Sequence, residues 1–160
     1  MARPAQNQGL MPSLLDRLID PDSAGTEWQR GYGPAQMLEA VRRDLEDLFN
    51  THRSALDFPS ALTETSASVV AFGMPDLAAI YSEAGGSRKD IPRLVAEIVA
   101  RFEPRLRDVR VVMVDTEARG ERRVRFQIEA GLNVDPSPEV AFETTLELAT
   151  GHASIRADEA

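Results

Sequence analysis

The spacing of the apolar residues changes at Pro104, and this change constrains the fold more than any other feature of the chain. Before Pro104, apolar residues recur every three or four positions, the period of a helix; after it they alternate, the period of a half-buried strand. Proline ends the helical part because it has no N–H to donate and forces Glu103 out of the helical region. We therefore expect helices first and strands last, an α+β order.

Two long amphipathic helices are predicted before this point, over residues 37–50 and 88–102. Each has an apolar stripe opposite a charged face, and Ser87 with Asp90 forms a near capping box at the start of the second. A short helix through Leu77, Ile80 and Tyr81 is also expected. The two stripes consist of Leu38, Val41, Leu45, Leu48 and Phe49, and of Ile91, Leu94, Val95, Ile98, Val99 and Phe102.

A further, short helix is predicted over residues 12–19, where Ser13 can cap a turn that carries Leu14, Leu15 and Leu18 on one face. Isolated helices under about 12 residues are marginal in water. We therefore expect these leucines to dock on another surface and count them as candidate partner-binding residues. The proline- and glycine-rich residues 20–34 are expected to form a loop or a linker.

Three strands are predicted after Pro104, and their links are too short for a parallel crossover, so neighbours should be antiparallel. The first strand is apolar on both faces, because Val112 and Val114 lie opposite its other valines. The resulting fold is a three-stranded meander with the N-terminal helices packed on one face. The alternating residues are Val109, Val111 and Met113; Val124, Phe126, Ile128, Ala130, Leu132 and Val134; and Val140, Phe142, Leu146 and Leu148.

The length of 160 residues fits one domain at roughly 150 residues per domain. We predict that domain over residues 12–150, after a flexible tail of residues 1–11. Residues 151–160 form either a fraying C-terminal tail or, through Ile155, an extension of the last strand.

Charge and composition exclude several classes of function. A net charge of -8 disfavours broad nucleic-acid binding and binding to anionic lipid. The absence of cysteine excludes a disulfide, a thiolate zinc site and a sulfur nucleophile. No stretch approaches 18 consecutive apolar residues, and no secretion signal is visible, so a cytoplasmic location is the default expectation.

Catalytic, metal and cofactor motifs are weak. His52 and His152 are the two histidines, and no nucleophile-elbow motif accompanies them. Residues 115–120 lack the alternating acids of a calcium loop, and the glycines at 85–86 fit neither phosphate-binding fingerprint. No cofactor is expected, and Glu103 is the best candidate for an acid in catalysis, because it follows a buried helix at the point where the chain leaves the core.

Glu103, Pro104 and Arg105 form the most informative triplet in the sequence. The proline imposes an extended path, so the acid and the base project to the same side of a rigid corner. Two interpretations remain open. The triplet is either a local ion pair, worth roughly 0 to 1 kcal/mol if exposed, or a fixed pair of charges that a partner binds.

At this triplet the chain resembles the phage-baseplate wedge proteins and their type VI secretion counterpart, TssE, in which a Glu-Pro-Arg signature follows a core helix. Phe72 and Met74 stand where tyrosine and leucine are expected, and His52 replaces a residue that is more often basic. The segments that carry the resemblance, in order, are 12–18, 42–51, 68–77, 102–106 and 134–139.

The resemblance implies a baseplate subunit that anchors and nucleates a contractile sheath. It implies contacts with the wedge subunits TssF, TssG and TssK and with the sheath subunits TssB and TssC, in a complex at the cytoplasmic side of the inner membrane. In such assemblies the sheath lends strands to the wedge protein's sheet, and the signature triplet is needed to build the sheath. An open sheet edge can accept such strands.

Some points stay open at this stage. Val112 and Val114 are covered either by another subunit or by the N-terminal helix. Members of this family have been labelled lysozyme-like, so the alternative function is a peptidoglycan hydrolase with Glu103 as general acid. A third class is an adaptor domain that works without a sheath.

Overall fold

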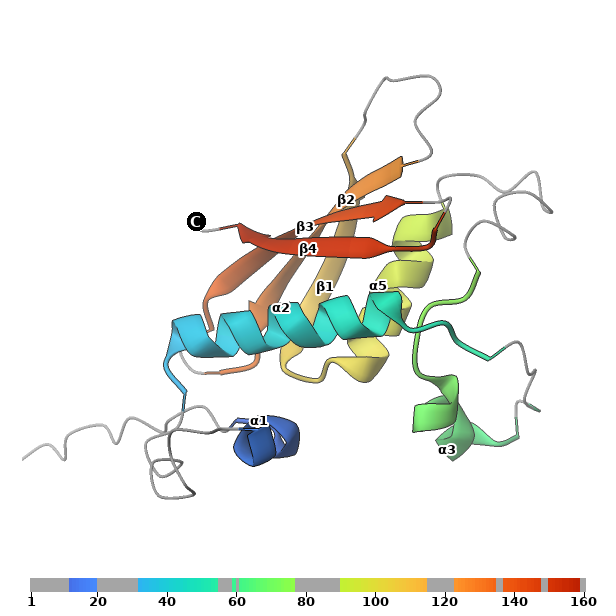
Figure 1. Ribbon diagram of the computed structural model, residues 1–160, viewed down its shortest axis with the longest axis horizontal. Helices are drawn as coiled ribbons and strands as arrows, with labels where there is room; N and C mark the ends of the chain where they lie inside the picture. The colour runs from blue at the N-terminus through green and yellow to red at the C-terminus, as the bar shows by residue number, and fades with distance from the viewer. Residues whose placement is uncertain are drawn as a thin grey trace, which may run out of the picture. The chain divides into compact units, whose positions relative to one another are not determined.

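The computed structural model divides the chain into two compact units, Met1–Ala40 and Val41–Ala160 (Figure 1). The predicted single-domain boundaries at residues 12 and 150 stay a prediction. The residues that the structure describes are 12–19, 32–54, 59, 61–76, 90–114, 123–134, 137–147 and 150–158.

The first unit contains the helix α1, Leu14–Ile19, and the first turns of the helix α2, Pro34–Asn50. Ser13 caps α1 as predicted: its Oγ accepts a hydrogen bond from the backbone N–H of Asp16 at 3.1 Å, and the Asp16 carboxylate accepts bonds from the Ser13 hydroxyl and N–H. Leu14 and Leu18 are 74% and 83% exposed, and Leu15 is also exposed.

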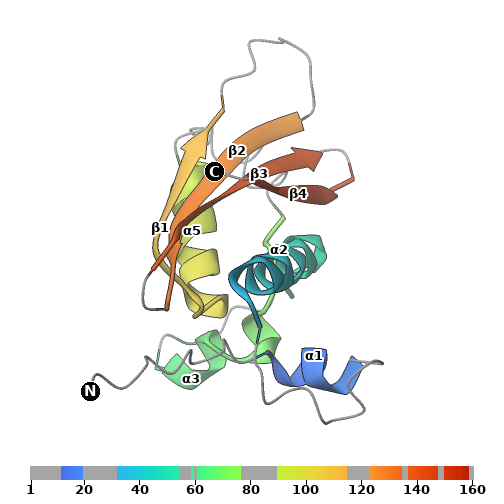
Figure 2. The ribbon, with the colours of Figure 1, turned by 90° about the vertical axis from the view of Figure 1, so that its left-hand side faces the viewer.

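The second unit is built on an antiparallel sheet in the order β1-β2-β3-β4 (Figure 2). The prediction of three strands is wrong, because Ala153 and Ile155 are buried and their strand pairs with β3 along its length. Ile155 therefore belongs to a separate fourth strand and does not extend the third strand, as one of the two alternatives for residues 151–160 had it. The strands are β1, Leu106–Met113; β2, Arg123–Leu132; β3, Glu139–Glu147; and β4, Ala153–Asp158.

The two faces of the sheet differ as the alternation predicts. One face carries the core, including Phe126, Ile128 and Phe142, which are almost fully buried. Phe49 of α2 meets Phe126 edge to face, with ring centroids 6.0 Å apart. These contacts do not establish that every N-terminal helix packs on this face, so that part of the predicted fold stays a prediction. The opposite face, here called the polar face, carries Arg123, Arg125, Gln127, Glu129, Glu143, Thr145, Ser154 and Arg156.

The helix α5, Asp90–Phe102, ends where the sequence predicts and lies beside β1 (Figure 2). The region expected to be irregular holds two short pieces, the helix α3, Thr63–Ser66, and the 3-10 turn η2, Val69–Ala71. The predicted helix through Leu77, Ile80 and Tyr81 lies outside the described residues, as does the Ser87 cap. Within the described ranges, the structure has no helix with the length and apolar character needed to cross a membrane.

Candidate functional site

The Glu103–Pro104–Arg105 triplet forms the corner between α5 and β1. The N–H of Glu103 donates the last bond of the helix, to the carbonyl of Val99 at 2.8 Å, and the N–H of Leu106 then donates to the carbonyl of Glu103 at 3.1 Å. Pro104 lies exposed in this turn, while Glu103 is buried. The chain therefore changes from helix to strand within three residues.

The carboxylate of Glu103 is fully engaged by Arg105. Its Oε1 accepts hydrogen bonds from the backbone N–H of Arg105 at 3.2 Å and from Nε at 2.7 Å, and its Oε2 accepts a bond from Nη2. The planar guanidinium matches the carboxylate with two parallel bonds. The ion pair expected as one alternative is present, but it is buried, with 5% of the Glu103 side chain exposed, so its removal matters more than that of a surface pair.

Asp44 of α2 joins this pair, a contact that the sequence analysis did not predict. Its carboxylate accepts a hydrogen bond from Nη2 of Arg105 and a second one, at 2.8 Å, from Nη2 of the neighbouring Arg43. Burial alone would lower the pKa of the Arg105 guanidinium, but hydrogen bonds and charge from Glu103 and Asp44 raise that pKa above its ordinary value. The corner is thus bonded to α2 across 61 positions of sequence.

The segment around Gly73 lies beside the end of α2. The N–H of Met74 donates to the carbonyl of Thr51 at 2.8 Å, and the N–H of Arg53 donates to the carbonyl of Met74 at 2.9 Å. Gly73 adopts φ 108, and a Cβ there would lie 2.4 Å from the Thr51 oxygen. Only glycine therefore fits this approach.

Phe72, one of the departures from the family pattern, packs edge to face on Phe102 with ring centroids 5.4 Å apart. Through this contact and the Asp44 bond, three of the five segments that carry the resemblance meet at the corner: 42–51, 68–77 and 102–106. The other predicted site residues lie elsewhere. Leu14, Leu15 and Leu18 belong to the first unit.

Val112 and Val114 lie at the far end of β1 from the corner. Val112 is opposite Gln127 in the register, so its side chain is on the polar face, and it is 49% exposed. The N–H of Val114 donates to the carbonyl of Arg125 at 3.0 Å, and its side chain is 40% exposed. Neither valine is covered by the described part of the chain.

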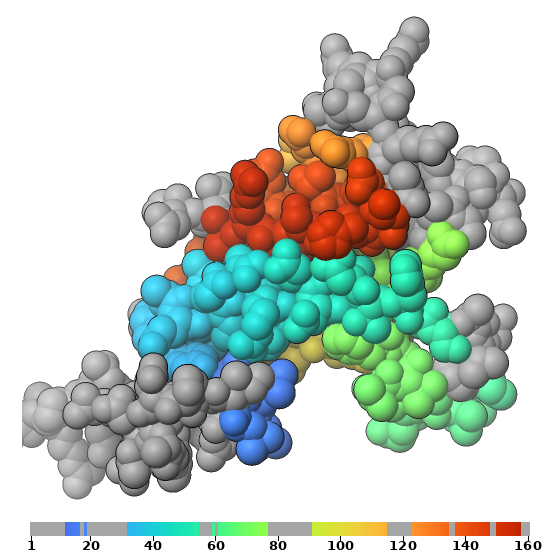
Figure 3. All heavy atoms as spheres, viewed as in Figure 1, coloured from blue at the N-terminus to red at the C-terminus, as the bar shows by residue number. Residues whose placement is uncertain are grey.

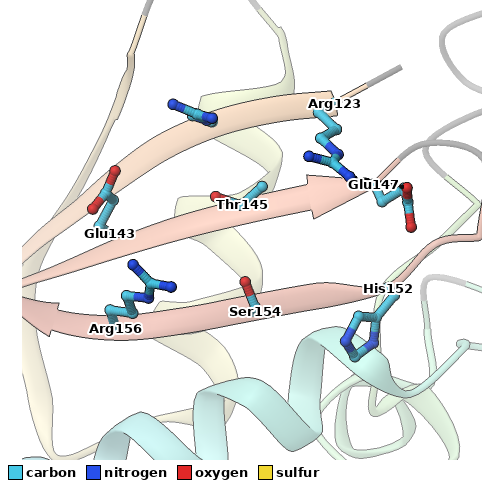
Figure 4. A pocket seen from close by; sticks show the side chains of 8 residues that line it. Arg123, Glu143, Thr145, Glu147, His152, Ser154 and Arg156 are labelled. Carbon is cyan, nitrogen blue, oxygen red and sulfur yellow. Dashed lines mark ion pairs between the residues drawn. The ribbon is translucent and has the colours of Figure 1, made fainter. Parts of the chain in front are cut away.

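A shallow pocket lies on the polar face, away from the corner. The labelled side chains of Arg123, Glu147, Ser154 and Arg156 project from β2, β3 and β4 on the same side of the sheet (Figure 4). Glu103 does not line it, and within the described ranges no group of acids and histidines is placed to hold a metal ion.

In a comparison with protein families, residues 35–137 match the model for the baseplate wedge protein gp25. This match supports the resemblance to TssE and includes the helix with Asp44, the Gly73 segment and the Glu-Pro-Arg corner. The comparisons with curated proteins and with solved structures gave no match. The matched range is well over half of the chain, and the chain therefore belongs to the family of the baseplate wedge protein gp25.

Proposed function

We propose that this protein is a structural subunit of the baseplate of a type VI secretion system, similar to TssE, which anchors the contractile sheath and starts its assembly. The family supports a structural baseplate role. In this proposal, TssF, TssG and TssK are its neighbours in the wedge, and TssB and TssC are the sheath subunits that it receives. The complex works at the cytoplasmic side of the inner membrane.

The observation that carries this proposal is the closed charge network at the corner. Both oxygens of the buried Glu103 carboxylate accept hydrogen bonds from Arg105, so neither is open to a sugar substrate. A general acid of a glycosidase needs a carboxyl that reaches the leaving oxygen across a cleft. The corner favours a scaffold over the alternative of a peptidoglycan hydrolase.

The corner would serve assembly by being rigid. Arg105 holds the helix-to-strand turn by Glu103 and holds α2 by Asp44, and this leaves Pro104 exposed at the tip for a partner. Glu103 and Arg105 then shape the partner-binding surface. Val112, Val114, Leu14, Leu15 and Leu18 are the exposed apolar residues that we propose as further contacts with neighbouring subunits.

The test is co-expression with TssB and TssC, followed by purification through a tag on this protein. We expect wild type to retain both sheath subunits and to release no fragments from purified peptidoglycan. Clean wild-type protein that hydrolyses peptidoglycan, with loss of that activity in Glu103→Gln, would establish the hydrolase and refute the proposal. A protein that retains neither sheath subunit would instead support an adaptor without a sheath.

A further inference from the structure

The two edges of the sheet differ in whether their outward backbone groups are free. In an antiparallel pair, alternate residues turn their N–H and C=O toward the neighbouring strand, and the residues between them turn theirs outward. The N–H of Glu147 donates to the carbonyl of His152 at 2.9 Å, so His152 and every second residue after it turn their backbone groups toward β3. The outward groups of β4 therefore belong to Ala153, Ile155 and Ala157.

Side chains of α2 bind half of this outward row on β4, namely both groups of Ala153 and the carbonyl of Ile155. The amide of Asn50 accepts a hydrogen bond from the N–H of Ala153 at 2.9 Å and donates one to its carbonyl at 3.0 Å, as a neighbouring strand would. Arg42 donates to the carbonyl of Ile155 at 3.3 Å. Residues 41–50 of α2 and β4 lie side by side on the surface (Figure 3), so this edge is partly covered from within the second unit, from Ala153 to Ile155.

The opposite edge, on β1, has no such cover in the described part of the chain. The N–H of Val114 donates to the carbonyl of Arg125, so Val114 and Val112 turn their backbone groups toward β2. Val111 and Met113 therefore turn theirs outward. No hydrogen bond from another described residue reaches this row, and β1 forms one margin of the sheet (Figure 2). A bulge between Arg107 and Arg110 ends the regular part of the strand on one side.

The side chains along this margin indicate what binds there. Val112 and Val114 are exposed on the polar face, and Arg110 precedes them on the same face, also exposed. Arg110 lies opposite Glu129 and forms no ion pair with any described residue. An added strand that matches this pattern has apolar side chains beside the two valines and an acidic one beside the arginine.

We propose that the strand added to this protein pairs with β1 and not with β4, and that it is an extended segment with apolar residues beside Val112 and Val114 and an acid beside Arg110. The inference rests on the proposed function, in which a sheath subunit supplies the strand. If only one edge accepts the added strand, the strand pairs in one register and the sheath grows in one direction. An exposed, apolar edge strand that nothing covers is otherwise prone to aggregate.

Proline substitutions at the two edges test this choice. Proline removes one N–H, and it is tolerated on an edge strand where that N–H faces outward. Val111→Pro removes a donor that only an added strand uses, and Ala157→Pro is the matched change on β4. With TssB and TssC co-expressed, we expect Val111→Pro to weaken retention of the sheath by at least about tenfold and Ala157→Pro to change it by less than about twofold. Loss in Ala157→Pro with retention in Val111→Pro would overturn the choice of edge and leave the proposed function intact.

Cross-linking gives a second readout that survives a folding defect in the proline variants. The wild-type chain has no cysteine, so Val112→Cys on β1 and Ser154→Cys on β4 are each the single thiol for a short thiol-reactive photo-cross-linker. We expect the first to cross-link to a sheath subunit and the second not to. The reverse pattern refutes the β1 edge. If wild type binds no sheath subunit, the proposed function fails, and this inference fails with it.

Discussion

Replacing Arg105 by alanine should destabilise the protein far more than replacing an arginine in a surface ion pair. The Glu103 side chain is 5% exposed, and in Arg105→Ala it keeps only the bond from the backbone N–H. Removing one partner of a buried ion pair costs about 3–5 kcal/mol, because the other charge is left buried and unpaired. The Asp44 side chain is 27% exposed, so water already screens its ion pair with Arg105. The loss of this pair in Asp44→Asn should therefore cost only about 1 kcal/mol.

The measurement is equilibrium unfolding in urea, followed by circular dichroism, with thermal melting in parallel. At about 2–4 °C per kcal/mol for a chain of this size, Arg105→Ala should lower Tm by on the order of 10 °C. The control is Arg93→Ala, whose ion pair with Glu97 is 84% and 54% exposed, and which should cost less than about 0.5 kcal/mol. Adding Glu103→Gln to Arg105→Ala should restore part of the stability, because it removes the buried charge.

The reasoning about the corner is wrong if Arg105→Ala costs no more than Arg93→Ala. It is also wrong if Glu103→Gln adds its full cost on top of Arg105→Ala, since two groups that form one buried pair cannot behave as independent sites. Either result would favour the other interpretation of the triplet, in which its charges bind a partner and contribute little to the stability of the free protein.

Two further substitutions test the surroundings of the corner and the partly covered edge. Gly73→Ala should cost at least about 2 kcal/mol in chemical unfolding, because of its positive φ and the clash with the Thr51 carbonyl. Gly33→Ala is the control and should cost less than about 1 kcal/mol, because an added Cβ would meet only the Gln36 side-chain oxygen at 3.8 Å, an ordinary contact. Asn50→Ala should expose the edge of β4 and cause association that rises with protein concentration in sedimentation, whereas Asp47→Ala on the same helix should stay as wild type; association in both, or in neither, contradicts the covering of this edge.

Much of the fold could be predicted from local pattern. The C-terminal end of α5 and the alternation of β2 follow from residues that are close in sequence, and the stop at Pro104 follows from the chemistry of one residue. β4 was not predicted as a separate strand, because it is short and Ala153 and Ile155 alone give a weak periodic signal. Its place in the sheet depends on β3, which supplies the partner bonds.

The candidate site divides in the same way. The sequence predicted that Glu103 and Arg105 project together, because they are two residues apart on a path that proline constrains. It could not predict Asp44, since an acid on the polar face of a helix has the same pattern whether it faces water or a distant arginine. Family resemblance marked the helix that holds Asp44 without indicating what that residue binds.

The sequence by itself determined the type and order of the elements, the charged corner and the family, because each of these depends on side chains within one or two turns of one another. The tertiary structure decided that the corner's charges are paired with each other and with α2. It also decided that Asn50 and Arg42 cover part of one edge of the sheet, while the other edge is left free of bonds from the described residues. These outcomes depend on which surfaces meet when helices and sheet pack, and that contact geometry is not encoded in the spacing of residues along any single element.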